Sequence, residues 1–106
     1  MKKEMNLDDL YFKKIKKGTK TVELRLYDVK RKSLKENDII VFNNRKTNEK
    51  IEVVIKGLER YQTFEEIINI YGDLTGVKNV NDLYNIYTKE EENKYGVLAI
   101  IFEKAI

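Results

Sequence analysis

The stretch GTKTVELRLYD, residues 18–28, alternates apolar and polar side chains as a half-buried β-strand does. One face carries a carboxylate and a guanidinium, on Glu23 and Arg25, one pleat apart, and Lys20 stands just before them. The other face is apolar and consists of Val22, Leu24 and Leu26. If the charged face meets solvent, it holds a surface ion pair worth about 0–1 kcal/mol. If it meets a cleft, Arg25 offers a planar fork for a phosphate or a base edge.

A short helix is predicted before this strand. Its apolar positions at helical spacing are Leu7, Leu10, Tyr11 and Ile15. Asn6 is the expected N-cap, and Asp9 stands at the third helical position, where a carboxylate completes a capping box. Gly18 is expected to end the helix, because glycine adopts the left-handed conformation without strain.

Two more strands are predicted after the opening stretch. They cover residues Ile39–Phe42 and Ile51–Tyr61. The turn before the first contains Asn37, a residue that tolerates the left-handed conformation. Gly57 is expected to make a bulge or bend in the second.

The C-terminal part of the chain predicts three short helices and a last strand. The helices begin with pairs of capping residues: Thr63 with Glu66, Asn79 with Asp82, and Thr88 with Glu91. Val97–Phe102 is almost wholly apolar, which is typical of a central strand buried on both faces. This order of elements predicts an α+β fold with a small sheet curled into an open barrel, because several apolar strands need a closed core.

Composition excludes several classes of protein. The chain has 106 residues and is interpreted as one domain, residues 1–106. It has no histidine and no cysteine, which excludes a Ser-His-Asp triad, a thiol nucleophile and His- or Cys-ligated zinc. No apolar run is long enough to span a membrane, and the N-terminus lacks the apolar region of a signal peptide. We therefore expect a cytoplasmic protein, a monomer or weak dimer, without membrane contact or cofactor.

Charge is unevenly distributed along the chain. Residues 1–60 hold 17 Lys and Arg against 10 Asp and Glu, whereas residues 61–106 hold 4 against 8. A basic half suggests an anionic partner such as nucleic acid, although a solvated lysine-rich surface explains the charge equally well. The lysines at 13, 14, 16 and 17 also suit the C-terminal end of the predicted helix, where cations meet the negative end of its dipole.

Tyrosines and glutamates supply further candidate site residues. Tyr84, Tyr87 and Tyr95, with Tyr71 before them, could stack on bases or pack half-buried in the core. The cluster Glu90–Glu92 could act in acid–base chemistry, but acidic residues also suit the first turn of a helix. Because the spacing of metal-binding aspartates is missing, no metal site is expected.

The signature Gly18-x-Lys20-x-x-Glu23-x-Arg25 resembles that of ASCH domains, in the PUA-like superfamily. Three later segments resemble the same family in the same order: LKENDIIVF at 34–42, YQTFEEII at 61–68 and YTKEEENKYGVLAI at 87–100. Asn37 stands where the family usually has glycine, and both residues adopt the left-handed turn. The chain therefore resembles a single ASCH domain, with four motifs spread over most of its residues.

The resemblance implies a small PUA-like β-barrel with short helices flanking a cleft that binds RNA or a nucleotide-like ligand. By position, Lys20, Glu23 and Arg25 would line this cleft. Weaker candidates for its opposite wall are Tyr87, Glu90, Glu92 and Tyr95. Lys17 and the neighbouring lysines would steer phosphates, and binding would then weaken steeply as salt rises.

An alternative is a small hydrolase acting on RNA or on a modified nucleoside. Some ASCH proteins are amidohydrolases that remove acetyl from acetylated cytidine, with a proposed site of a lysine, a threonine three residues later and a distant glutamate. Lys20 matches the lysine, but Glu23 stands where the threonine would be. If the protein is an enzyme, the expected catalytic residues are Lys20 and Glu23. An interaction module without a small ligand is a third hypothesis.

Overall fold

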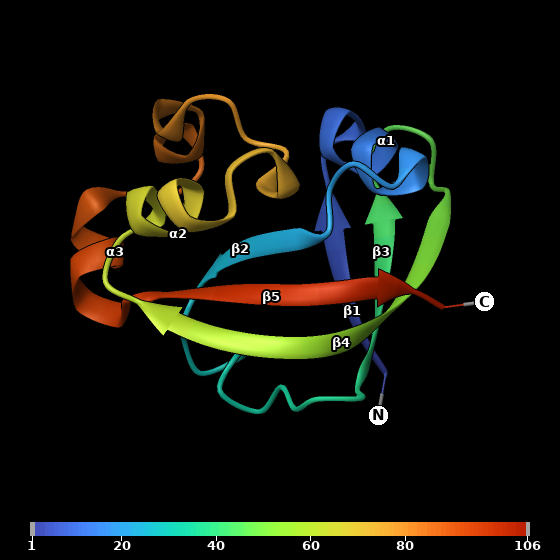
Figure 1. Cartoon of the computed structure of the whole chain (residues 1–106), viewed down its shortest axis with the longest axis horizontal. Coiled ribbons are helices and arrows are strands. Elements are labelled where there is room, and N and C mark those ends of the chain that lie inside the picture. The colour runs from blue at the N-terminus through green and yellow to red at the C-terminus, as the bar shows by residue number, and fades with distance from the viewer. Residues whose placement is uncertain (1, 106) are drawn as a thin grey trace.

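The structure, a computed structural model describing residues 2–105, is built on one mixed five-stranded sheet (Figure 1). The strands are β1 (Lys2–Leu7), β2 (Val22–Leu26), β3 (Ile39–Asn44), β4 (Lys50–Tyr61) and β5 (Val97–Lys104). Their order is β1-β3-β4-β5-β2, with β1 parallel to β3 and the other neighbours antiparallel. The sheet curls into a half-barrel with β1 and β2 as its edges, which confirms the expected α+β fold.

Helices flank strand β2 on two sides (Figure 1). One side has α1 (Asp9–Lys17), and the other has α2 (Phe64–Tyr71), the 3₁₀ turns η1 (Gly72–Thr75) and η2 (Val80–Asn85), and α3 (Lys89–Tyr95). None of the helices within residues 2–105 has the length and apolar character needed to cross a membrane.

The prediction that the chain's first element is a helix was wrong. Residues Lys2–Leu7 form strand β1, so Asn6 lies in a strand and does not cap α1. The N-cap is Asp8, which makes no side-chain capping hydrogen bond, and α1 ends at Gly18 as predicted. Met5 and Leu7 alternate with exposed neighbours and are buried against β3. Leu7 fits both the helical spacing of the residues after it and the alternation of the residues before it. Pairing with β3, some 37 residues further along the chain, decides that it lies in a strand.

Most of the other local signals match the structure, and the predicted pair of Asn79 with Asp82 does not. Thr63 and Thr88 each form a complete capping box with Glu66 and Glu91. Asn79 caps the 3₁₀ turn η2 by accepting from the Asn81 N–H, without the predicted partner Asp82. Asn37 has φ of 72°, in the left-handed region, and the register of β4 shifts between Ile55 and Gly57, as a bulge requires.

The hydrophobic core lies on both faces of the sheet. Inside the half-barrel, α1 packs on a cluster that includes Phe12, Ile15, Phe42, Leu98 and Ile100. On the outer face, the α2–α3 group covers a second cluster that includes Val22, Leu24, Leu26, Phe64 and Val97. Residues 97–100 of β5 are buried, because the strand contributes to both clusters. The apolar face of β2 therefore belongs to the outer cluster, and its polar face turns inward.

Candidate functional site

Glu23 and Arg25 lie on the inner face of the half-barrel. Their cross-strand partners on β5 are Ile100 and Leu98, both in the inner core cluster. Their exposed fractions are only 5% and 9%, and Lys20 is 1% exposed. Three charged side chains are thus buried together beside the free edge of β2, which excludes a solvent-exposed ion pair on this strand.

The carboxylate of Glu23 accepts from donors on both of its oxygens. Oε1 accepts from the backbone N–H of Leu24 at 3.1 Å and lies 3.1 Å from Lys20 Nζ. Oε2 accepts from Arg25 Nε at 2.9 Å and lies 2.8 Å from Arg25 Nη2. Each charge in the cluster is therefore compensated by hydrogen-bonded partners, as burial of ions requires.

The ammonium of Lys20 has three acceptors. Besides Glu23, it donates to the carbonyl of Val22 at 2.8 Å and to that of Thr75 at 2.6 Å. Its aliphatic stem runs past Gly76, where an added Cβ would stand 3.1 Å from Lys20 Cδ. Gly76 also has φ of 72°. Glycine therefore allows this backbone conformation and leaves space for the side chain of Lys20.

Lys20 and Glu23 together bind two backbone groups on the free edge of β2. Odd-numbered residues of this segment direct their backbone groups to β5, since Thr21 O accepts from Phe102 N and Tyr27 N donates to Gly96 O. Backbone groups of the even-numbered residues therefore point to the open edge. There Lys20 binds the carbonyl of Val22 and Glu23 binds the N–H of Leu24. This protects the edge from pairing with another chain.

Arg25 connects the two edges of the half-barrel. Its Nη2 donates to the carbonyl of Asn6 on β1 at 2.9 Å, while Nε and Nη2 hold Glu23 on β2. The phenol of Tyr87 also interacts with its guanidinium. Arg25 is therefore a fixed cation in the seam where β1 and β2 face each other without pairing.

The pKa shifts follow from burial and from the three charges. Burial alone would raise the pKa of Glu23, but Lys20 and Arg25 lower it to about 2. Burial lowers the pKa of Lys20 in spite of Glu23, and the like charges of Arg25 and Lys14 lower it further. For Arg25 the opposing effect of burial is outweighed by Glu23, and its pKa is raised. Glu23 is thus ionised throughout the physiological pH range.

A pocket opens above this cluster, between α1 and β1 on one side and η2 on the other. We call it the central pocket. Its polar lining consists of Asn6, Asp8, Tyr11, Lys20, Glu23, Arg25, Arg45 and Tyr87, and its apolar lining of Leu7, Leu24, Val77, Leu83 and Ile86. Its volume is about 60 Å³, well below the roughly 300–1,000 Å³ of pockets that enclose a whole ligand. It therefore admits one group of a larger molecule.

The walls of the central pocket combine aromatic rings with a net positive charge. Tyr87 is backed by Phe64, whose ring is stacked at 5.2 Å, and Tyr11 lies 5.6 Å from Lys20 Nζ. At the pocket's rim, Arg45 Nε stands 3.9 Å from the carboxylate of Asp8. Three cations and two anions line the pocket, so its formal charge favours an anionic ligand.

The structure brings together Lys20, Glu23, Arg25 and Tyr87 and sets the other predicted site residues apart. Lys17 is exposed at the end of α1 and does not line the central pocket. Glu92, a residue of α3, is buried against the start of α2. There its carboxylate accepts from Phe64 N at 2.8 Å and from the phenol of Tyr84. Tyr95 is 37% exposed on α3, with Lys94 Nζ 5.2 Å from its ring, and Glu90 is exposed nearby.

The other lysines of α1 are largely held by neighbouring groups. Lys13 pairs with Asp9 at 3.0 Å, Lys16 pairs with Glu49 at 2.8 Å, and Lys14 donates to the carbonyl of Gly76 at 2.7 Å. Their charge remains, but much of this basic cluster has a structural role.

Sequence reasoning missed four polar residues of the central pocket, namely Asn6, Asp8, Tyr11 and Arg45. Asn6 is expected from the sequence as a helix cap, and Tyr11 as an apolar position of the helix that follows. No local pattern marks them, because they reach the pocket through the parallel pairing of β1 with β3 and the loop that follows β3. Within residues 2–105, no cluster of three or more acidic side chains could hold a metal ion.

Comparison with known proteins identifies relatives of the whole chain. A family model described as ASCH domain matches residues 5–106. The crystal structure of the hypothetical protein PH0355 is 38% identical, with a TM-score of 0.86, and covers 99% of this chain and 100% of its own. The solution structure of protein PF0455 from Pyrococcus furiosus is 34% identical, with a TM-score of 0.77, and covers 98% of this chain and 97% of its own. No curated protein matches the chain.

Proposed function

Because the chain belongs to the ASCH domain family, which is generally thought to bind RNA, we propose that the central pocket binds the base edge or the phosphate of one nucleotide, in single-stranded RNA or in a nucleotide-like ligand. The observation that carries this proposal is the fixed cation in the seam. Arg25 is held by Glu23 and by the carbonyl of Asn6, beside the rings of Tyr11 and Tyr87. An anchored guanidinium next to aromatic rings suits a ligand that combines an anion or base edge with a planar ring.

Each lining group has a role in this proposal. Arg25 binds a phosphate or an acceptor edge of the base, and Tyr11 and Tyr87 contact the base, at about 1–3 kcal/mol per stacked base. The carbonyl of Leu24, on the free edge of β2, is an acceptor for an exocyclic amino group. Lys20 and Glu23 act as positioning residues, since their own hydrogen-bonding groups are already used. Single-stranded RNA fits better than duplex, because only unstacked bases enter such a pocket.

The hydrolase alternative has less support in the geometry. Three acceptors surround Lys20 Nζ and favour the protonated ammonium, which has three hydrogens to donate, whereas burial lowers the pKa of Lys20 and favours the neutral amine. With a pKa of about 2, Glu23 carries no proton to deliver at neutral pH. Both groups would have to leave their partners before either could take part in hydrolysis.

A binding titration tests the proposal. Nucleoside monophosphates and short RNA oligonucleotides are titrated by calorimetry into wild type, Arg25→Gln and Lys17→Gln. Loss of a charged hydrogen bond costs about 1.5–3 kcal/mol, so Arg25→Gln should weaken binding roughly 10- to 150-fold. Lys17→Gln makes the same charge change outside the pocket and should leave nucleotide affinity within about twofold.

Two controls separate binding from folding and from turnover. Since Arg25→Gln disturbs a buried charge cluster, thermal melting must show that it is folded, and Tyr11→Leu provides a second, milder variant. The proposal is contradicted if wild type binds neither nucleotides nor RNA. It is also contradicted if both variants keep the saturable binding of wild type. Incubation with acetylcytidine and RNA, followed by chromatography, tests the alternative: turnover that disappears in Lys20→Ala would establish a hydrolase.

A further inference from the structure

A second hollow lies beside the central pocket, between β1 and the loop that joins β2 to β3. We call it the loop pocket. Its lining includes Lys3 from β1 and Lys30, Arg31 and Ser33 from the loop, and its volume is about 250 Å³. In Figure 1 this loop runs beneath the sheet, near the N-terminus. Neither the family match nor the sequence motifs assign a role to it.

The two pockets adjoin along β1. Residues 3–5 of this strand line the loop pocket, and residues 6–8 line the central pocket. At about 3.3 Å per residue, the middles of these two segments are separated by roughly 10 Å. Arg31, which lines the loop pocket, is paired with Asp28 at 2.8 Å, and Tyr87 lines the central pocket. A chain that occupies the central pocket can therefore reach the loop pocket along β1.

The loop pocket has an excess of positive charge. Arg31 is balanced by Asp28 at 2.8 Å, and Glu4 is shared with Lys50 at 3.4 Å. Within the described part of the chain, Lys3 and Lys30 have no carboxylate at ion-pair distance. Two ammonium groups on opposite sides of the hollow are therefore available to an anion.

The loop is held in place before any ligand binds. The N–H of Arg31 donates to Asp28 Oδ1 at 3.3 Å, and Leu34 is buried in the inner core cluster. At the start of the loop, the ring of Tyr27 has two cations nearby, Arg60 at 4.1 Å and Lys32 at 5.7 Å from its centre. Because the backbone of the loop is already ordered, binding costs less entropy than it would with a flexible loop.

We propose that the loop pocket binds the phosphodiester group next to the nucleotide in the central pocket, so that the protein contacts an RNA chain at two adjoining points. This inference rests on the proposed function and extends it to the substrate class: an oligonucleotide, with a single nucleotide making only part of the contacts. Lys3 and Lys30 contact the phosphate from opposite sides, and the central pocket reads the neighbouring base. Phosphate contacts of this kind add affinity and salt dependence with little sequence preference.

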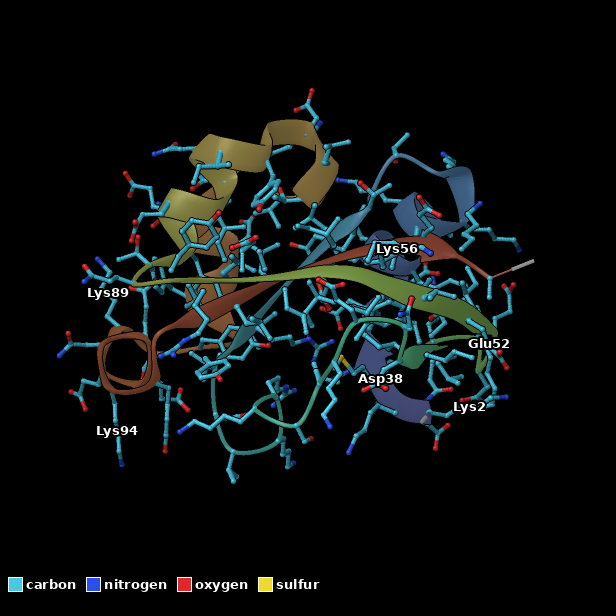
Figure 2. All side chains as sticks on the ribbon, turned by 60° about the horizontal axis from the view of Figure 1, so that its bottom comes forward. Lys2, Asp38, Glu52, Lys56, Lys89 and Lys94 are labelled. Atoms are coloured by element: carbon cyan, nitrogen blue, oxygen red, sulfur yellow. The ribbon has the colours of Figure 1, made fainter. Side chains whose placement is uncertain are left out.

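A chain-length series tests this inference. A nucleoside monophosphate and RNA oligomers of increasing length are titrated into wild type, the double variant Lys3→Gln/Lys30→Gln and the control Lys56→Gln/Lys94→Gln. Lys56 on β4 and Lys94 on α3 are exposed, line neither pocket and give the same change in net charge (Figure 2). All three proteins should bind the monophosphate alike. For oligomers, the first double variant should bind about ten- to thirtyfold more weakly at 0.1 M salt, with a salt slope smaller by about 1.4, since each single-strand contact contributes about 0.7.

The outcomes separate this inference from the proposed function. If Arg25→Gln abolishes oligomer binding but Lys3→Gln/Lys30→Gln does not weaken it, the loop pocket proposal fails and the central pocket stands. The loop pocket proposal also fails if the control pair weakens oligomer binding equally, or if Lys3→Gln/Lys30→Gln weakens monophosphate binding as much as oligomer binding. If wild type binds neither monophosphate nor oligomer, both proposals fail together.

Discussion

Glu23 has the central structural role among the site residues. Its carboxylate holds Lys20, Arg25 and the N–H of Leu24, so it fixes two side chains and one strand edge at once. Removing one partner from a buried charge cluster costs about 3–5 kcal/mol, because the remaining charges stay buried and uncompensated. The G-x-K-x-x-E-x-R spacing thus has a physical reason in this chain: the lysine and glutamate bind two backbone groups on the edge of β2, and the glutamate orients the arginine.

The stability of the protein should depend on the protonation of Glu23. Its pKa is about 2 in the folded protein, against an ordinary value of 4.5. The stabilisation is therefore complete above about pH 4.5 and is lost as pH falls toward 2, because the unfolded chain takes up the proton first. Wild type should lose on the order of 3 kcal/mol over this window through this residue. Urea denaturation at pH 5, 3.5 and 2.5 measures the loss.

Two variants isolate this contribution. Glu23→Gln should be less stable than wild type at pH 5 and should lose less stability on acidification, because it has no carboxyl to titrate at this position. Glu36→Gln removes an exposed glutamate and should keep the wild-type dependence on pH. Equal loss of stability between pH 5 and 2.5 in wild type and Glu23→Gln would contradict the assigned pKa.

At the scale of elements, helices α2 and α3 are joined through the side chain of Glu92. Its carboxylate accepts from the first N–H of α2, on Phe64, and from the phenol of Tyr84, whose pKa is raised to about 12 by burial and by this carboxylate. A negative charge at a helix N-terminus is also favourable to the helix dipole. These contacts explain the burial of Glu92 without any ligand.

Substitution of Glu92 separates stability from ligand binding. Glu92→Ala leaves the N–H of Phe64 buried without its partner and should cost about 1–3 kcal/mol in urea denaturation. Glu90→Ala, in the same turn but exposed, should change stability by no more than about 0.5 kcal/mol. Nucleotide affinity of folded Glu92→Ala should stay within about twofold of wild type, since the two sites share no residue. A folded Glu92→Ala protein that no longer binds nucleotide would place Glu92 in the ligand site.

At the scale of the whole molecule, the half-barrel is open at one seam. Among the strands of the described residues, β1 pairs with β3 alone, and Arg25 contacts it from the opposite edge through the carbonyl of Asn6. The central pocket occupies this seam, where the two edges do not pair. A binding site in an open barrel therefore depends on a bond that holds the edges at a fixed separation.

Hydrogen exchange should reveal this dependence. Arg25→Gln removes the contact of Arg25 with Asn6 and should speed amide exchange in β1 by several-fold, through local opening, relative to the central strands β4 and β5. Lys17→Gln, which changes the same charge outside the seam, should exchange as wild type does. Mass spectrometry of peptides covering residues 2–7 measures the effect. Unchanged exchange in β1, with the variant folded, would show that Arg25 does not hold the seam.

Local features of the chain determined most of the elements. The strands β2 to β5, the bulge at Gly57, the turn at Asn37 and the capping boxes of α2 and α3 follow from neighbouring residues, because alternation, left-handed turns and caps act over a few positions. Strand β1 was not predicted from these local features. Residues 2–7 are short, and their alternation is decided only by pairing with β3.

The sequence by itself determined that Glu23 and Arg25 share one face of a strand, since side chains alternate on β2 whatever surrounds it. Only the tertiary structure decided which face turns inward, that Lys20 folds back to the carbonyl of Val22, and that Asn6 and Tyr11 reach the same pocket. The physical reason is the distance along the chain over which each effect acts. Spacing along a strand is fixed by backbone geometry over a few residues, whereas burial and charge pairing depend on the curl of the sheet, which brings β1 and β2 together.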